Sequence, residues 1–174
     1  MMKNKKILLL LLTFAMLVSV LVSCGEKKND ITYREEGLEL TLPTSMRRSY
    51  SSVYEFYFST PDSVLTAKKL DGDFMESMAM SKNTTPEEYA EAYISANSLD
   101  KSRINYKYDS ESGAYRMRYN NSDGESGEDL LHFISILGEP GAIWFVEIVC
   151  ENSKASIYEQ TFELWESTIR TYKE

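Results

Sequence analysis

Hydrophobic and polar residues alternate in several short segments of this chain, which predicts β-strands. Residues 37–43 place leucines at positions 38, 40 and 42 on one face, and Pro43 ends the segment. Two further apolar runs, residues 53–59 and 64–70, flank the turn sequence Thr-Pro-Asp-Ser. Because a Pro-Asp pair favours a tight turn, these two runs predict a hairpin.

The second half of the chain repeats this alternation in four predicted strands: residues 103–108, 114–119, 130–137 and 143–150. The last is the most apolar, so we place it at the centre of the sheet. One face of that strand is a predicted core surface, formed by Trp144, Val146, Ile148 and Cys150.

Two segments have helical spacing. Thr85, Pro86 and Glu88 form a capping-box sequence, which predicts a helix from residue 86 to about residue 98. Residues 74–80 are consistent with one or two weaker helical turns.

A closing helix is predicted near the C-terminus, with Asn152 or Ser153 as its cap. Its apolar residues recur every three or four positions and predict a stripe that faces the sheet: Tyr158, Phe162, Trp165, Ile169 and Tyr172. The acidic residues between them are expected to face water: Glu159, Glu163 and Glu166.

The N-terminus has the pattern of a secretory signal. Lysines at positions 3, 5 and 6 precede an apolar run from Ile7 to Val22. An uncleaved membrane helix is the alternative, but sixteen residues span only about 24 Å of a hydrocarbon core of roughly 30 Å. We therefore favour cleavage.

The end of this run, Leu21-Val22-Ser23-Cys24, resembles the lipobox of bacterial lipoproteins. The resemblance implies cleavage after Ser23 and a diacylglycerol on the Cys24 thiol, which anchors the protein to a membrane, facing away from the cytoplasm. We accordingly divide the chain into a signal peptide (1–23), a lipidated tether (24–30) and a single domain (31–174).

The order of elements predicts an α+β domain, an antiparallel sheet flanked by helices. Three stretches resemble the PsbP-like and Mog1-like fold, namely residues 36–43, 85–90 and 143–148. Members of this fold group mostly bind or support partners, including photosynthetic complexes and a small GTPase. None of their functional residues maps onto this chain.

Charge excludes one class of partner. Residues 1–23 hold three of the 19 basic residues and none of the 27 acidic ones, so the rest has 16 against 27, a net charge of −11. Such a surface repels nucleic acid and anionic lipid headgroups. We therefore expect no nucleic-acid binding.

Few residues suit catalysis. His132 is the single histidine and lies in a predicted strand, and no Gly-x-Ser-x-Gly sequence accompanies it. Glu147 is a carboxylate within the most apolar strand, so it is exposed, paired with an arginine such as Arg116 or Arg118, or part of a site. Pairing is the favoured interpretation. Cys150 is either a small buried residue or an exposed thiol. We predict no catalytic residue, cofactor or enzymatic activity.

Possible metal ligands occur in two groups. Methionines at positions 75, 78 and 80 suit copper, although methionine commonly fills gaps in cores. Acidic residues on Gly-containing loops suit calcium, although loops carry them for backbone reasons too: Asp71, Asp73, Asp123, Glu125, Glu128 and Asp129. We predict no metal site, and keep a metal- or ligand-binding lipoprotein as the second hypothesis.

The favoured hypothesis is a non-enzymatic binding or accessory module of the cell envelope, with an envelope protein as its partner. The tyrosine-rich strands at residues 103–108 and 114–119 are the candidate surface, because aromatic residues and arginine are enriched at binding hot spots. The alternative is that these tyrosines pack under the helices.

Overall fold

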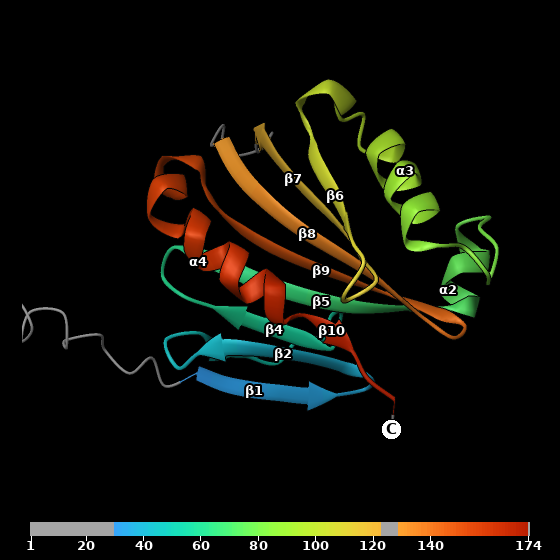
Figure 1. The fold of residues 1–174 in the computed structure, drawn as a ribbon, viewed down its shortest axis with the longest axis horizontal. Coiled ribbons are helices and arrows are strands. Elements are labelled where there is room, and N and C mark those ends of the chain that lie inside the picture. The colour runs from blue at the N-terminus through green and yellow to red at the C-terminus, as the bar shows by residue number, and fades with distance from the viewer. Residues whose placement is uncertain (1–29, 123–128, 174) are drawn as a thin grey trace, which may run out of the picture.

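The computed structural model describes residues 30–122 and 129–173, and these form two antiparallel sheets with three α-helices (Figure 1). The large sheet has the strand order β3-β4-β5-β9-β8-β7-β6. This confirms the predicted α+β class with an antiparallel sheet flanked by helices. The strands of the large sheet are β3 (Arg47–Arg48), β4 (Phe56–Ser59), β5 (Ser63–Asp71), β6 (Asn105–Asp109), β7 (Ala114–Ser122), β8 (Asp129–Glu139) and β9 (Ala142–Glu151).

The small sheet has three strands in the order β1-β2-β10. They are β1 (Asp30–Glu35), β2 (Leu38–Pro43) and β10 (Arg170–Thr171). The sequence analysis identified β2 but missed its two partners. Strand β1 does alternate, with Ile31 and Tyr33 on the side of the leucines of β2. The two-residue strands β3 and β10 are too short to leave a periodic signal.

Strand β9 lies at the centre of the large sheet, as predicted, between β5 and β8. Its predicted core face is confirmed, because Trp144, Val146, Ile148 and Cys150 are all buried. The predicted hairpin is also present: β4 and β5 pair from Ser59 opposite Val64 to Phe56 opposite Ala67.

Each face of the large sheet has its own hydrophobic core. Helix α4 (Ala155–Thr168) and the small sheet cover the first, which we call the α4 face. Helices α2 (Gly72–Ser77) and α3 (Pro86–Ala96) cover the second, the α3 face. Successive residues of a strand point to opposite faces, so β7 directs Tyr115, Met117 and Tyr119 to the α3 face. Its arginines lie on the α4 face.

The predicted capping box at the start of α3 is confirmed. The Thr85 backbone N–H donates to Glu88 Oε2 over 2.8 Å, and the Glu88 N–H donates to Thr85 Oγ1 over 3.2 Å. These bonds satisfy backbone donors that a helix end otherwise leaves unpaired. A 3₁₀ turn, Lys101–Arg103, then leads into β6.

The closing helix differs from its prediction at both ends. A 3₁₀ turn, Asn152–Lys154, precedes α4, and neither Asn152 nor Ser153 is its N-cap. The helix ends at Thr168 because the chain then turns extended to pair with β2. Phe162 and Trp165 are buried as predicted, whereas Tyr172 lies beyond the helix.

A tight turn joins β1 to β2. Glu36 and Gly37 both have positive φ, at 54° and 90°. The positive φ of Gly37 already disfavours a side chain at this position. There is also no room for one, since a Cβ atom there would lie 2.8 Å from Glu139 Oε2. Glycine therefore allows the small sheet to approach the turn between β8 and β9.

Candidate functional site

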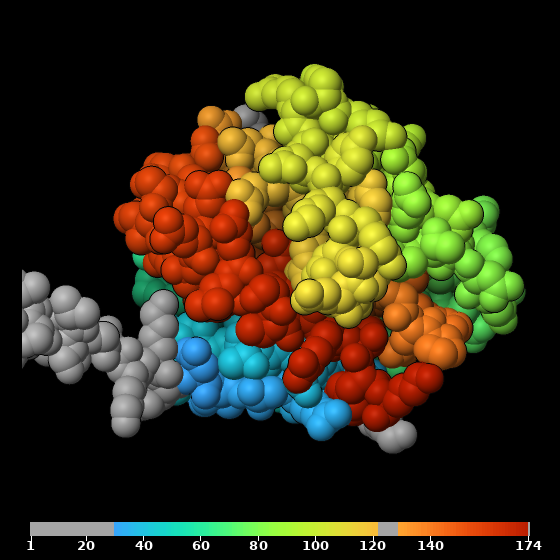
Figure 2. All heavy atoms as spheres, in the orientation of Figure 1, coloured from blue at the N-terminus to red at the C-terminus, as the bar shows by residue number. Residues whose placement is uncertain are grey.

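A groove of about 600 Å³ runs between the last strands of the large sheet and α4. Helix α4 packs mainly against β2, β8 and β9, so β6 and β7 extend past it. In Figure 2, atoms of α4 and of β6 stand on either side of a hollow in this face. The groove is lined by Asn105, Lys107, Tyr108, Asp109, Ser110, Glu111, Arg116, Met117, Arg118, Glu163, Glu166 and Ser167.

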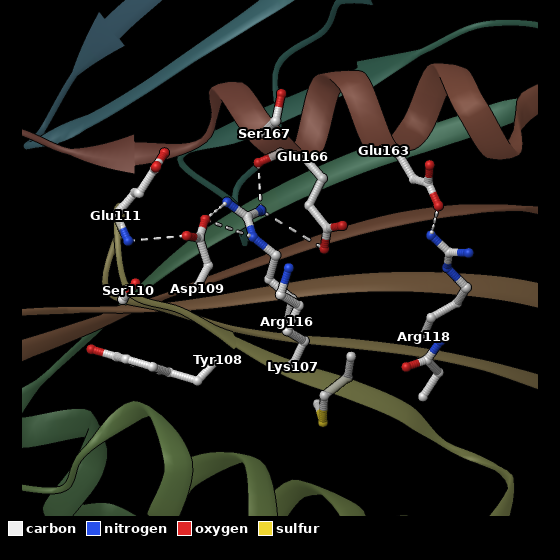
Figure 3. Close-up of a pocket in the computed structure, with 12 residues that line it drawn as sticks. Lys107, Tyr108, Asp109, Ser110, Glu111, Arg116, Arg118, Glu163, Glu166 and Ser167 are labelled. Carbon is white, nitrogen blue, oxygen red and sulfur yellow. Dashed lines mark hydrogen bonds and ion pairs between the residues drawn. The ribbon is translucent and has the colours of Figure 1, made fainter.

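Arg116 lies at the floor of the groove, with a side chain only 12% exposed (Figure 3). Its Nη2 donates to Asp109 Oδ2 over 2.9 Å and to Ser112 Oγ over 3.2 Å. Its Nη1 donates to Ser135 Oγ over 3.1 Å and to the backbone carbonyl of Glu166. The guanidinium therefore ties the β6–β7 hairpin and β8 to α4, and its bonding capacity is used within the protein.

The two carboxylates beside Arg116 differ in their pKa values. Hydrogen bonds from Ser112 and then from Arg116 lower the pKa of Asp109 well below its ordinary value. Burial raises the pKa of Glu166, although Arg116 and Ser135 partly offset this effect. Desolvation penalises the charged form of Glu166, whereas Asp109 accepts enough hydrogen bonds to favour its charged form.

Arg118 stands further along the same wall. It donates to Glu159 Oε1 and Glu163 Oε1, each over 2.7 Å, and its guanidinium lies 4.3 Å from the centre of the Phe133 ring. The prediction that the α4 glutamates face water is confirmed for Glu159 and Glu163, which are half exposed although paired with Arg118. It is wrong for Glu166, which is nearly buried beside Arg116.

A smaller hollow of about 250 Å³ shares Asn105 and Arg118 with the groove and reaches Asn152 and Ala155 at the start of α4. The combined surface is polar. Its Arg116 and Arg118 are paired with carboxylates, whereas Arg103 and Lys107 add positive charge to its lining. This chemistry suits a polar, extended chain better than an apolar ligand.

Strand β6 forms the outer rim of the groove and is the last strand of the large sheet. It pairs with β7 alone, so its other side has backbone N–H and C=O groups open to a further strand. Tyr106 and Tyr108 are large exposed side chains on this strand, whereas Tyr115 and Tyr119 of β7 are buried. The structure thus divides the predicted tyrosine-rich surface into an exposed half and a core half.

His132 and Glu147 contact each other on the α3 face, away from the groove. His132 Nδ1 and Glu147 Oε1 are 2.9 Å apart, and the His132 ring is stacked on Tyr119 at 4.6 Å. The predicted pairing of Glu147 with Arg116 or Arg118 is wrong, because both arginines point to the opposite face. The register explains the actual pair: Glu147 lies opposite Ile134, two residues along β8 from His132.

Two tyrosine hydroxyls adjoin this pair. Tyr93 of α3 and Tyr119 of β7 are linked by a hydrogen bond of 2.9 Å between their Oη atoms. Burial raises the pKa of Tyr119 to about 12 and also raises the pKa of Tyr93. Both hydroxyls are therefore protonated at physiological pH, and they connect α3 to the sheet.

The candidate metal ligands fall into separate places. Asp71 accepts a hydrogen bond from the Phe74 N–H as the N-cap of α2, and Asp73 pairs with Lys82 on the surface. Met75 is buried, while Met78 is exposed. Asp129 begins β8, and Asp123, Glu125 and Glu128 lie outside the described residues. Within residues 30–122 and 129–173, no three His, Cys, Asp or Glu side chains cluster as a metal site would require.

Of the two cysteines, Cys150 lies among the described residues. Cys150 is buried, and burial raises the pKa of its thiol to about 11. The thiol is therefore an unreactive core group rather than an exposed one. Cys24, the predicted lipidation site, lies outside the described residues.

Two solved structures share this fold. The solution structure of cyanobacterial PsbP (CyanoP) from Synechocystis sp. PCC 6803 matches with a TM-score of 0.57 and 13% identity, over 86% of this chain and 98% of that one. The Ran-binding protein Mog1p of Saccharomyces cerevisiae matches with a TM-score of 0.51 and 8% identity, over 83% and 96%. At such identities the likeness shows the fold alone, and it confirms the PsbP-like and Mog1-like resemblance at that level.

Sequence comparison adds no family. No protein-family model matches the chain, and no curated protein matches it. Among the residues that the structure describes, no helix has the length and apolar character needed to cross a membrane.

The sequence analysis missed the groove, although it named Arg116 and Arg118. Strand alternation did place these arginines on the face of the sheet that Tyr115 and Tyr119 do not occupy. This was the only hint of the groove that the sequence analysis offered. Nothing local in the sequence states which face α4 covers, or how far across the sheet it reaches.

Proposed function

We propose that this chain is a lipid-anchored accessory protein of the cell envelope, which binds a partner protein along the free edge of β6 and the neighbouring groove. The anchor is inferred from the lipobox resemblance at Cys24. The binding role rests on one observation. An edge strand with two exposed tyrosines borders a polar groove whose arginines are already paired.

The geometry favours a partner segment in extended conformation. Such a segment adds to an open sheet edge through main-chain hydrogen bonds, and its alternate side chains reach the two sides of the sheet. Here one set would meet Tyr106 and Tyr108, and the other would enter the groove beside Lys107 and Arg118. The opposite edge strand of the large sheet, β3, is only two residues long and offers a much poorer template.

Site-specific crosslinking in the native cell tests the binding surface. A photoreactive amino acid replaces Tyr106 or Tyr108 in the full chain, and the control replaces Tyr50, which is 93% exposed in the loop between β3 and β4. We expect one defined protein adduct from positions 106 and 108 that position 50 does not form. Equal adducts at all three positions, or none at 106 and 108, would contradict the proposal.

Substitution of Cys24 tests the anchor separately. The wild-type protein should show an acylated N-terminal cysteine by mass spectrometry and fractionate with membranes. Cys24→Ala should lose the acyl mass. A wild-type protein without acylation would refute the anchor while leaving the crosslinking result to stand by itself.

A further inference from the structure

The end of the domain where β1 begins is separated from the predicted lipid by very little chain. Strand β1 starts at Asp30, and only residues 25–29 lie between Cys24 and this strand. The six steps from residue 24 to residue 30 reach at most about 20 Å when fully extended. If Cys24 is acylated, as proposed above, the start of β1 therefore stays within about 20 Å of the lipid headgroups.

This end of the domain also includes the first turn of α4 and the turn between β4 and β5 (Figure 1). The last two are held together by Asp62, which accepts a hydrogen bond from the Tyr158 hydroxyl over 2.9 Å and lies 3.9 Å from Lys154 Nζ. Tyr33 of β1 packs against the same core as Ala155 and Tyr158. The start of β1 and the start of α4 thus belong to one rigid surface.

Two apolar side chains project from this surface. Ile31 is 42% exposed in β1, and Ile157 is 65% exposed in the first turn of α4. Neither lines the groove. Exposed isoleucines on a surface held close to a bilayer gain free energy by entering the interface between headgroups and acyl chains.

The charge of the domain favours one kind of lipid surface. Residues 24–174 have a net charge of −11, so an anionic surface would repel the domain as a whole. Contact is therefore expected with zwitterionic headgroups, and it is too weak to hold without the anchor.

From the tether length, the shared position of these elements and the two exposed isoleucines, we propose that the β1–α4 end of the domain rests on the membrane through Ile31 and Ile157. This inference depends on the proposed anchor. It also fixes the orientation of the protein. Helix α2 follows the end of the nine-residue strand β5 that is further from the bilayer, so α2 lies roughly 30 Å from the membrane-facing end of the domain.

Depth-dependent fluorescence quenching tests this orientation. The acylated full-length protein is reconstituted into phosphatidylcholine vesicles with brominated acyl chains, after single fluorophores are attached through Ile31→Cys, Ile157→Cys, Leu164→Cys or Met78→Cys. Cys24 is then acylated and Cys150 is buried, so neither competes for the label. Leu164 is the matched control, because it is 52% exposed on the same helix but two turns further from the start of α4.

We expect quenching at positions 31 and 157 to exceed that at 164 and 78 at least threefold. Ile157→Ser should reduce quenching of the label at position 31 by half or more, whereas Leu164→Ser should leave it unchanged. Equal quenching at all four positions, or the strongest at position 78, would overturn the orientation while the anchor stands. If the protein isolated from the cell proves not to be acylated at Cys24, both the anchor and the orientation are overturned.

Discussion

The two faces of the large sheet differ in the polar groups that they bury. The α4 face places the guanidinium groups of Arg116 and Arg118 under and beside a helix, each paired with carboxylates. The α3 face has hydroxyl groups and the His132–Glu147 contact. Strand β7 supplies the two arginines to one face and Tyr119, at an alternate position, to the other.

The domain thus buries polar groups in both cores, as ion pairs on the α4 face and mainly as hydrogen-bonded hydroxyl groups on the α3 face. Among the described residues, no buried side-chain nitrogen or oxygen lacks a hydrogen-bond partner. A satisfied network costs little, whereas removal of one member leaves the others buried without partners. The two faces should therefore respond differently to substitution and to pH.

The largest effect is expected at Arg116. Arg116→Ala leaves Asp109 and Glu166 without their cation and should lower the free energy of unfolding by about 3 kcal/mol. Arg118→Ala is the matched control, with a loss of about 1 kcal/mol or less, because its partners Glu159 and Glu163 are half exposed. Urea unfolding of the two variants measures the difference. Equal losses would mean that Arg116 does not hold the hairpin to α4.

Asp109 and Glu166 should give opposite pH dependences. The pKa of Asp109 is lowered in the folded chain, so its stabilisation is present above about pH 4 and is lost as the pH falls further. The pKa of Glu166 is raised, so the folded chain retains a proton that the unfolded chain has lost, and stability falls as the pH rises above about 4.5.

Substitution should remove each dependence separately. Asp109→Asn should cost about 2 kcal/mol at pH 7 and much less near pH 2.5. Glu166→Gln should gain stability relative to wild type as the pH rises from 4 to 7. Urea midpoints over this range test both, and parallel pH profiles for the two variants would contradict the assignment.

The smallest effect is expected on the α3 face. Tyr93→Phe removes the hydrogen bond to Tyr119 and should cost about 1 kcal/mol, because both rings remain in place. Tyr119→Phe should cost about the same. In a double-mutant cycle, the second substitution should add little to the first. Fully additive losses would show that the two hydroxyls do not interact.

Local patterns in the sequence were sufficient for much of the fold. The capping box at Thr85 and Glu88 depends on residues three apart, and the near-continuous apolar run of β9 indicates a strand covered on both faces. Both predictions held because the information lies within a few residues. Strand β1 also alternates, but its six residues directly follow the predicted tether, and no strand was predicted there.

The candidate site depended on information that no local pattern contains. The sequence shows that Arg116 and Tyr115 point to opposite faces, since alternation is a property of any strand. It does not show that α4 lies over the arginines, nor that it stops short of β6. Likewise, the contact between His132 and Glu147 depends on the register of β8 against β9.

What the sequence determined by itself was therefore the longer helices and most of the longer strands, the buried faces of these elements and the Cys24 motif that predicts the anchor. The tertiary structure decided which charges meet, where the groove opens and which end of the domain bears exposed isoleucines. The physical reason is that periodicity is set by backbone geometry over a few residues. Pairing and exposure are set instead by packing between elements far apart in the chain, such as β6 and α4.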